Sequence, residues 1–233
     1  MSIAENITRI EERIQKACDT AGRKRGDITL MGVSKFEPVN KAEEAFHAGI
    51  RYFGESRVKE ALSKFETFKD ERPVRLHLIG SLQRNKAKQA ALFFDCIQSV
   101  DRPQLILELA RYASLREKPL EILLELHTGE ESKSGFKDFD SLFMAAQTVM
   151  ESANLKPSGL MTMAPFTADK EVIRRSFRQL VKAREELVKR FSSDNGKNWA
   201  CLSMGMSNDF ETAVEEGSTM LRIGSLIFKD DEK

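Results

Sequence analysis

Of the side chains in this sequence, Lys35 is the clearest candidate for a chemical role. It comes directly after the apolar segment 28–33, so it stands at the carboxyl end of an expected buried strand. Partial burial disfavours the ammonium form of a lysine and frees its amine to attack an aldehyde. The same position also suits a lysine that extends its ammonium into water at the rim of the fold, and the residue alone does not separate these two interpretations.

Two segments near the end of the chain have the character of an anion-binding site. Met204-Gly205-Met206-Ser207-Asn208-Asp209 follows one apolar run, and Arg222-Ile223-Gly224-Ser225 ends the last one. The first leads into a helix for which Asn208 and Glu211 have the spacing of a capping box. Small residues and exposed backbone N–H groups at such positions bind phosphate, although each turn taken alone is equally typical of an ordinary loop.

The elements that position these residues alternate regularly along the chain. Apolar runs predict strands at 28–33, 50–53, 76–79, 96–100, 120–126, 158–163, 199–204 and 220–223. Helical spacing of apolar residues predicts helices at 3–21, 40–48, 57–68, 85–93, 103–116, 139–152, 170–191 and 209–216. This order favours an α/β fold, a single (β/α)8 TIM barrel with an extra N-terminal helix. An open doubly wound sheet is the alternative, weakened because no GxGxxG segment follows the first strand.

Composition excludes several classes of protein. The 233 residues include 37 Lys and Arg against 36 Asp and Glu, so the net charge of +1 lacks the basic field of a general nucleic-acid binder. No apolar run reaches the roughly 20 residues that cross a membrane. The three cysteines are far apart and form no CxxC pair, which predicts neither a disulfide framework nor a metal site and favours the reducing cytoplasm. No segment resembles a linker, so we expect one domain over residues 1–233.

Closure of the barrel brings the first strand beside the last. Lys35 then neighbours Ser207 and the turn of Gly224 and Ser225, where barrels frequently bind phosphate. A molecule that carries both an aldehyde and a phosphate would use both features, which favours pyridoxal 5'-phosphate as the cofactor. A barrel enzyme that acts on a sugar phosphate through the same residues, with no cofactor, is the alternative.

Several segments resemble the pyridoxal phosphate homeostasis proteins across almost the whole chain. In order, they are 32–35, 53–55, 77–86, 99–102, 131–136, 159–163, 202–207 and 222–224. The resemblance implies a fold-type III barrel similar to the N-terminal domain of alanine racemase. It also implies that pyridoxal phosphate is held as a Schiff base.

The resemblance implies a role for each of five residues. Lys35 matches the lysine that forms the Schiff base, and Ser207, Gly224 and Ser225 fall where the family binds the phosphate. Arg222 matches the arginine that faces the pyridine nitrogen. A guanidinium does not accept a proton, so the ring nitrogen stays unprotonated and the cofactor is a weaker electron sink.

Three further residues are expected at the cofactor. His77 and Met204 lie inside matching segments, and Ser56 stands where the family commonly has a longer asparagine. His127 stands where the family often has asparagine, and we expect a packed or rim side chain there, with contact to the cofactor or a bound partner as the alternative.

The expected function is that of a carrier rather than an enzyme. Racemisation needs acid–base groups on both faces of a planar intermediate, and Lys35 serves only one. The only tyrosines, Tyr52 and Tyr112, fall in an expected strand and helix away from the barrel mouth. We therefore expect a cytoplasmic monomer that carries pyridoxal phosphate in vitamin B6 homeostasis, with B6 vitamers and apo-enzymes as partners; an amino-acid racemase is the alternative.

Overall fold

The computed structural model describes residues 1–129, 134–191 and 197–229, so part of the matching segment 131–136 lies outside the described residues. The strands are β1 (Thr29–Val33), β2 (Tyr52–Glu55), β3 (Arg75–Leu78), β4 (Cys96–Val100), β5 (Leu120–Glu125), β6 (Leu155–Met161), β7 (Cys201–Ser203) and β8 (Met220–Ile223). The helices are α1 (Ile3–Ala21), α2 (Val39–His47), α3 (Val58–Glu71), α4 (Ala87–Phe93), α5 (Pro103–Ala113), α6 (Phe139–Met150), α7 (Lys170–Arg190), α8 (Phe210–Glu215) and α9 (Ser225–Phe228). None of these described helices has the length and apolar character needed to cross a membrane.

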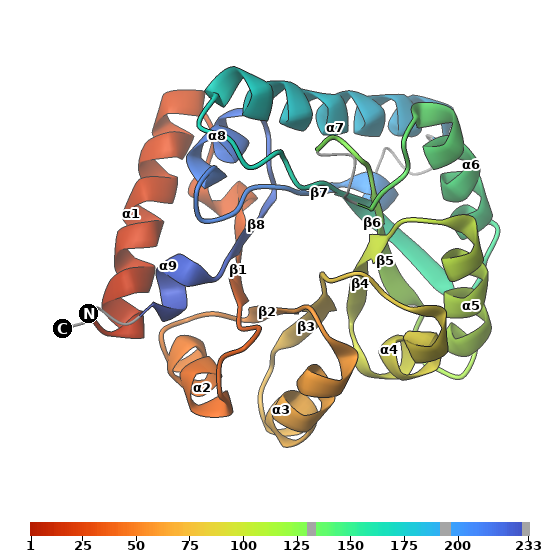
Figure 1. Cartoon of the computed structure of the whole chain (residues 1–233), viewed down its shortest axis with the longest axis horizontal. Helices are drawn as coiled ribbons and strands as arrows, with labels where there is room; N and C mark the ends of the chain where they lie inside the picture. The colour runs from red at the N-terminus through yellow and green to blue at the C-terminus, as the bar shows by residue number, and fades with distance from the viewer. Residues whose placement is uncertain (130–133, 192–196, 230–233) are drawn as a thin grey trace.

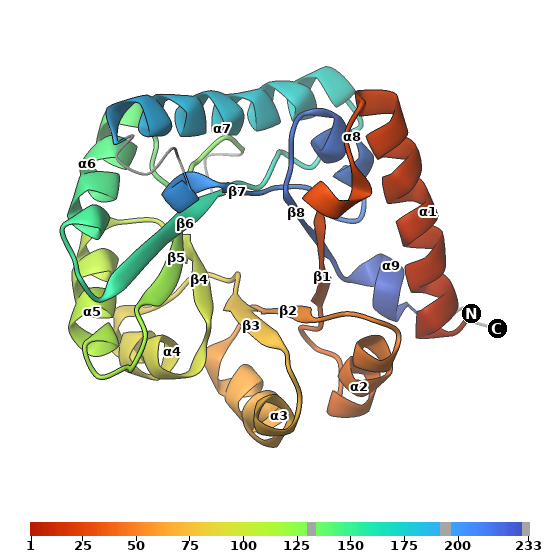
Figure 2. The ribbon, with the colours of Figure 1, turned by 180° about the vertical axis from the view of Figure 1, so that it is seen from behind.

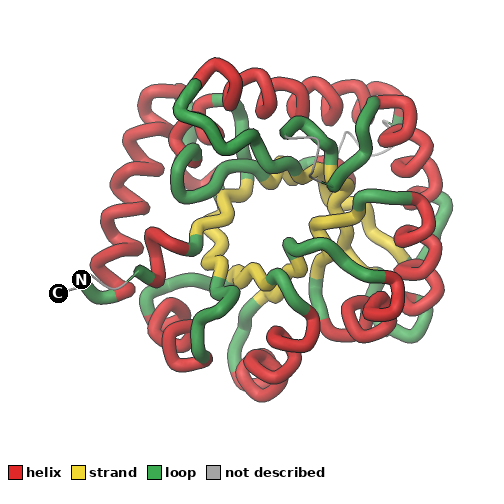
Figure 3. The backbone as a smooth tube through the Cα atoms, in the orientation of Figure 1, coloured by secondary structure: helices red, strands yellow, loops and turns green. Residues whose placement is uncertain are grey.

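The strands form a closed parallel barrel in the order β1 to β8, and β8 pairs with β1. Figure 1 looks along this barrel, and Figure 3 shows the strands as an inner ring with the helices around it. Because the strands are parallel, their carboxyl ends all lie at the same end of the barrel. The predicted (β/α)8 barrel is confirmed, and the open sheet is excluded.

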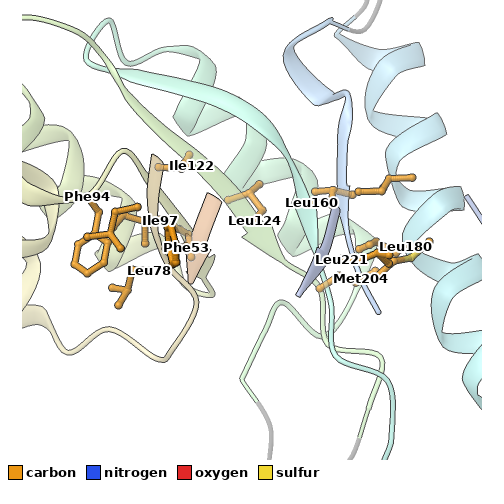
Figure 4. Close-up of a cluster of buried hydrophobic side chains, with 14 of the residues drawn as sticks. Phe53, Leu78, Phe94, Ile97, Ile122, Leu124, Leu160, Leu180, Met204 and Leu221 are labelled. Atoms are coloured by element: carbon orange, nitrogen blue, oxygen red, sulfur yellow. The ribbon is translucent and has the colours of Figure 1, made fainter. Parts of the chain in front are cut away.

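Apolar side chains fill the layer between the barrel and the helices. Phe53 of β2 packs against Phe65 and Phe68 of α3, with ring centroids 5.5 and 5.9 Å apart. On another side of the barrel, Leu221 of β8 lies near Leu180 of α7, and both are fully buried (Figure 4). Removal of this apolar surface from water is the main driving force that holds the helices against the barrel.

The inside of the barrel is unusually polar. Successive side chains of a strand point to opposite faces, so Leu123 of β5 points inward while its neighbours join the outer layer. Leu123 belongs to a small apolar cluster with Cys96 and Met161. The other buried side chains of the interior include the polar His77, Gln98, Ser203 and Arg222. Barrels of this kind are usually filled by branched aliphatic residues.

The predicted N-terminal helix is confirmed as α1. Ser2 caps it in a capping box with Glu5, and Gly22 ends it with a left-handed φ of 65°. Figures 1 and 2 both show α1 alongside α8 and α9, near the two chain ends. The side chain of Asn6 donates a hydrogen bond of 3.1 Å to the carbonyl of Ile227, which ties α1 to α9.

Most elements begin or end one to three residues away from the predicted boundaries, and one observed helix was not predicted. β2 begins at Tyr52 rather than at Ile50, because the ladder with β1 starts where Tyr52 pairs with Met31. β6 begins earlier than predicted, at Leu155, because its ladder with β5 extends to that residue. The helix α9 was not predicted, since four residues are too few to show a helical apolar period.

Candidate functional site

A cavity of about 530 Å³ opens at the carboxyl ends of the strands. Six of the residues predicted for the site line it: Lys35, Ser56, Ser207, Arg222, Gly224 and Ser225. The rest of its lining is Val33, Ile79, Gly80, Ser81, Glu125, Ser134, Met163, Met206 and Asn208. Closure of the barrel therefore brings together residues from the two ends of the sequence.

Lys35 lies in a tight turn directly after β1. The backbone N–H of Glu37 donates to the carbonyl of Ser34 at 3.0 Å, and Phe36 between them has a left-handed φ of 69°. The Lys35 side chain is exposed, and its Nζ lies 5.9 Å from the centre of the Phe36 ring. The predicted partial desolvation of Lys35 is therefore wrong, because the turn projects beyond Ser34, the last buried residue of this segment.

A buried ion pair between Lys64 and Glu55 anchors the start of the turn that carries Lys35. Nζ of Lys64 in α3 lies 2.8 Å from Oε1 of Glu55 and donates to the carbonyl of Ser34 at 2.6 Å. The Ser34 hydroxyl donates to the same carboxylate oxygen at 2.7 Å. Ser34 and Glu55 are fully buried, so the clamp of Ser34, Glu55 and Lys64 fixes the peptide that precedes Lys35. A left-handed Phe36 is strained, and such a conformation persists only where the surrounding structure enforces it.

The loops after β2 and β3 touch at the rim of the cavity. A Cβ atom at Gly80 would lie 2.2 Å from the carbonyl oxygen of Ser56, so only glycine fits there. The backbone of Ser56 is therefore pinned, and its short hydroxyl lies in the cavity wall.

The turns after β7 and β8 lie side by side. The Ser225 hydroxyl donates to the Ser207 hydroxyl at 2.9 Å. A Cβ at Gly224 would lie 2.9 Å from the carbonyl oxygen of Val33, so the glycine lets this turn approach the end of β1. Two hydroxyl groups thus stand together in the cavity wall, next to the strand that leads to Lys35.

The predicted capping box at the start of α8 is wrong. Asp209, not Asn208, is the N-cap, and its side chain makes no bond to the first turn of the helix. Its Oδ1 instead accepts the backbone N–H of Met206 at 2.5 Å, and burial raises the pKa of this carboxyl group. The Met206 N–H is therefore used within the turn.

Arg222 supplies a fixed positive charge in the cavity wall. Its side chain is almost fully buried, and Nη1 donates to Ser203 Oγ at 2.7 Å while Nη2 donates to the Thr162 carbonyl at 2.8 Å. Burial lowers the pKa of Arg222, and the nearby carboxylates Asp209 and Glu125 act in the opposite direction. A guanidinium nevertheless remains a cation in proteins.

Comparison with known proteins shows which family this barrel comes from. Residues 5–232 match the model of the alanine racemase N-terminal domain. The pyridoxal phosphate homeostasis protein of Aquifex aeolicus (strain VF5) is 38% identical over 228 residues, which cover 98% of each chain. The chain belongs to the pyridoxal phosphate homeostasis protein family. Its relative of that name in Vibrio cholerae serotype O1 is 36% identical over 231 residues, 97% of this chain and 95% of the relative.

Solved structures agree with this family assignment. PipY of Synechococcus elongatus PCC7942, solved with PLP bound, has a TM-score of 0.83 and 30% identity, and the match covers 97% of this chain and 100% of PipY. The alanine racemase of Clostridium difficile 630 has a TM-score of 0.72 at 13% identity, over 99% of this chain and 58% of the racemase. The homeostasis family therefore shares its barrel fold with one part of the racemase.

Met204 does not line the cavity of this family member. Side chains alternate along an extended segment, and Ser203 points into the barrel, so Met204 points out of it. It is fully buried in the outer apolar layer near Leu221 and Leu180 (Figure 4). The expected contact between Met204 and the cofactor is therefore corrected to a packing role.

His77 points into the barrel but lies below the cavity. It precedes Ile79, a lining residue, by two positions, which places it one layer deeper on the same face. Its Nδ1 lies 2.9 Å from Nε2 of Gln98, its ring packs edge-on against Tyr52, and burial lowers its pKa to about 4. The expected direct contact is corrected here too: His77 is a neutral side chain of the barrel interior.

The structure adds Glu125 to the lining residues that were predicted. Glu125 is the buried last residue of β5, and its carboxylate accepts a hydrogen bond of 3.4 Å from the Ser134 hydroxyl. Glu125 lies near the carboxyl end of a run rich in Leu and Ile, and a charged residue in such a position is a signal similar to the one that singled out Lys35 in the sequence. His127 is half-buried and outside the lining, in agreement with the rim position expected for it.

No metal chemistry is indicated at the site. Within the described ranges, no three His, Cys, Asp or Glu side chains are grouped in a way that would hold a metal ion. Burial raises the pKa of the Cys201 thiol to about 11 and also raises the pKa of the Cys96 thiol. Both thiols therefore stay protonated near neutral pH and are poor metal ligands. The polar side-chain groups of the described lining residues are an amine, hydroxyls, a carboxamide, a carboxylate and a guanidinium.

Proposed function

We propose that this chain carries pyridoxal 5'-phosphate as a Schiff base on Lys35 and serves vitamin B6 homeostasis without catalytic turnover. One observation carries the proposal: a single cavity holds an exposed lysine amine, a pair of adjacent hydroxyls and a buried guanidinium. These groups fit the aldehyde, the phosphate and the ring nitrogen of the cofactor. The names of the relatives and the PLP-bound structure of PipY support the same assignment.

Each group has a defined task in this proposal. When bound, the cofactor supplies an aldehyde, to which the Lys35 amine adds with loss of one water molecule. Ser207 and Ser225 would each donate a hydrogen bond to the phosphate, the Ser225 proton turning to it from Ser207, and Gly224 lets the turn that carries Ser225 sit close to β1 and Lys35. Arg222 faces the ring nitrogen and cannot take a proton from it or give it one readily, which keeps that nitrogen unprotonated.

The arrangement of proton-transfer groups favours a carrier over a racemase. Tyr112 lies on the outer helix α5, and Tyr52 lies at the start of β2 against the His77 ring, far along the strand from the cavity. Among the described lining residues, Glu125 is the one carboxylate, and it interacts electrostatically with Arg222. Because this proposal places Arg222 at the ring nitrogen, Glu125 would lie on that side of the bound cofactor, away from the carbon that a racemase must deprotonate.

The open position of Lys35 suits transfer of the cofactor to another protein. An exposed amine at the cavity mouth is accessible to water and to incoming amines. We infer that the chain acts in the cytoplasm as a monomer and exchanges B6 vitamers with apo-enzymes that need the cofactor.

Addition of pyridoxal phosphate to the purified chain tests this function. We expect a new absorption band in the visible or near-ultraviolet range that persists through gel filtration, and no change in the enantiomeric purity of alanine or other amino acids. Sustained racemisation would contradict the carrier function and support the racemase alternative. A chain that stays colourless and takes up no cofactor would contradict both and leave the sugar-phosphate enzyme.

Replacement of both hydroxyls, Ser207→Ala with Ser225→Ala, tests the phosphate site. Hydrogen bonds to a charged group contribute about 1.5–3 kcal/mol each, so loss of two should cost about 3–6 kcal/mol and lower the affinity for pyridoxal phosphate at least about 100-fold. The affinity for pyridoxal, which lacks the phosphate, should be unchanged. Equilibrium dialysis measures both, and Ser114→Ala, an exposed serine after α5, is the control. Equal losses for the two vitamers would place the phosphate elsewhere.

A further inference from the structure

A chain of hydrogen bonds crosses the barrel interior from Arg222 to His77. Arg222 of β8 donates to Ser203 of β7 at 2.7 Å, and Ser203 Oγ donates to Oε1 of Gln98 in β4 at 2.6 Å. Nε2 of Gln98 then lies 2.9 Å from Nδ1 of His77 in β3. β4 and β7 are not neighbours in the barrel, so the bond between Ser203 and Gln98 spans its interior. We call the set of Arg222, Ser203, Gln98 and His77 the interior relay.

The direction of every bond in the relay is fixed by Arg222. A guanidinium only donates, so Ser203 Oγ must accept from it and give its own proton to Gln98. The Gln98 amide is then oriented with its oxygen toward Ser203 and its nitrogen toward His77. His77 must accept at Nδ1, which a neutral imidazole does and a protonated one does not, and burial keeps this ring neutral.

All members of the relay are buried. Gln98 and Ser203 are completely inaccessible, and His77 and Arg222 are nearly so. Buried polar groups in a low-dielectric interior stabilise a structure only when they are paired, and a continuous chain of them is rigid. In most barrels, branched aliphatic residues fill this space instead. The one member that reaches the cavity is Arg222.

We propose that Ser203 and Gln98 are positioning residues that hold the Arg222 guanidinium at the ring of the bound cofactor. This inference rests on the proposed function. A second anchor, the Thr162 carbonyl, accepts from Nη2, so the two terminal nitrogens of the guanidinium are each held by one acceptor. Thr162 is itself fixed, because its hydroxyl donates to the Leu126 carbonyl at 2.8 Å. Loss of the Ser203 hydroxyl leaves the guanidinium with one anchor and free to turn.

The test compares Ser203→Ala, Gln98→Met and Ser218→Ala, each loaded with pyridoxal phosphate. Ser218 is a matched control, because it is completely buried and its hydroxyl donates to the Met204 carbonyl at 2.7 Å, outside the relay. We expect Ser203→Ala to weaken cofactor affinity about tenfold and to shift the wavelength of its absorption band. Gln98→Met, one bond further from Arg222, should do the same to a smaller extent, and Ser218→Ala should retain both properties of the wild type.

The absorption band separates positioning from a merely structural role. Thermal unfolding of the cofactor-free variants measures stability, and we expect Ser218→Ala to lose stability without any shift of the band. If Ser203→Ala and Gln98→Met bind the cofactor with wild-type affinity and wavelength, or if the control shifts as they do, the inference is overturned. Failure of the wild-type chain to bind pyridoxal phosphate would instead overturn the proposed function.

Discussion

Lys35→Met is expected to weaken retention of pyridoxal phosphate at least about 100-fold, a loss of roughly 2.7 kcal/mol. Methionine is unbranched and only one atom shorter than lysine but has no amine, so the covalent bond is lost while Ser207, Ser225 and Arg222 remain in the cavity. The fold should be unaffected, because Lys35 is exposed. Equilibrium dialysis with fluorescence detection measures the residual binding.

Lys118→Met is the control for this substitution. Lys118 is also exposed but lies just before β5, at the opposite end of the barrel from the cavity. We expect it to bind the cofactor as the wild type does. Wild-type affinity in the Lys35 variant would show that phosphate and ring contacts alone hold the cofactor, contrary to the proposal.

Lys64→Met is expected to reduce the free energy of unfolding by about 3–5 kcal/mol. The substitution leaves the fully buried carboxylate of Glu55 without its cation, and an unpaired buried charge is strongly unfavourable. Urea denaturation measures the loss. Because the clamp of Ser34, Glu55 and Lys64 holds the peptide before Lys35, we also expect slower formation of the covalent bond to the cofactor.

Two further variants test the origin of this loss. Lys59→Met removes an exposed lysine from the same helix, α3, and should change stability by less than about 0.5 kcal/mol. The double variant Glu55→Gln with Lys64→Met removes both charges and should recover much of the loss. If the single and double variants are equally unstable, packing of the Lys64 side chain rather than the ion pair is responsible.

The barrel was predictable because its strands and helices repeat in a regular order. Parallel strands buried on both faces read as continuous apolar runs, and their carboxyl ends define where a site must lie. Lys35, Ser207, Arg222 and Ser225 could be placed together because barrel closure makes β1 and β8 neighbours. That step needed only strand order, without any knowledge of side-chain direction.

The facing of individual side chains was not predictable from the same pattern. In a strand buried on both sides, polar and apolar residues do not alternate, so the sequence does not reveal that Ser203 faces inward and Met204 outward. For the same reason, the sequence did not show that His77 lies below the cavity rather than in its wall. The exposure of Lys35 depends on where the turn after β1 leaves the barrel, and the bond from Ser203 to Gln98 joins residues 105 positions apart.

Borohydride reduction of the wild-type chain loaded with pyridoxal phosphate, followed by peptide mapping, tests the central claim most directly. Reduction makes the Schiff base permanent, so the modified residue can be identified by mass spectrometry. We predict that the cofactor is found on the peptide that contains Lys35, at one equivalent per chain. A stoichiometric label on another lysine, such as Lys64, with Lys35 unmodified would contradict this account of the site.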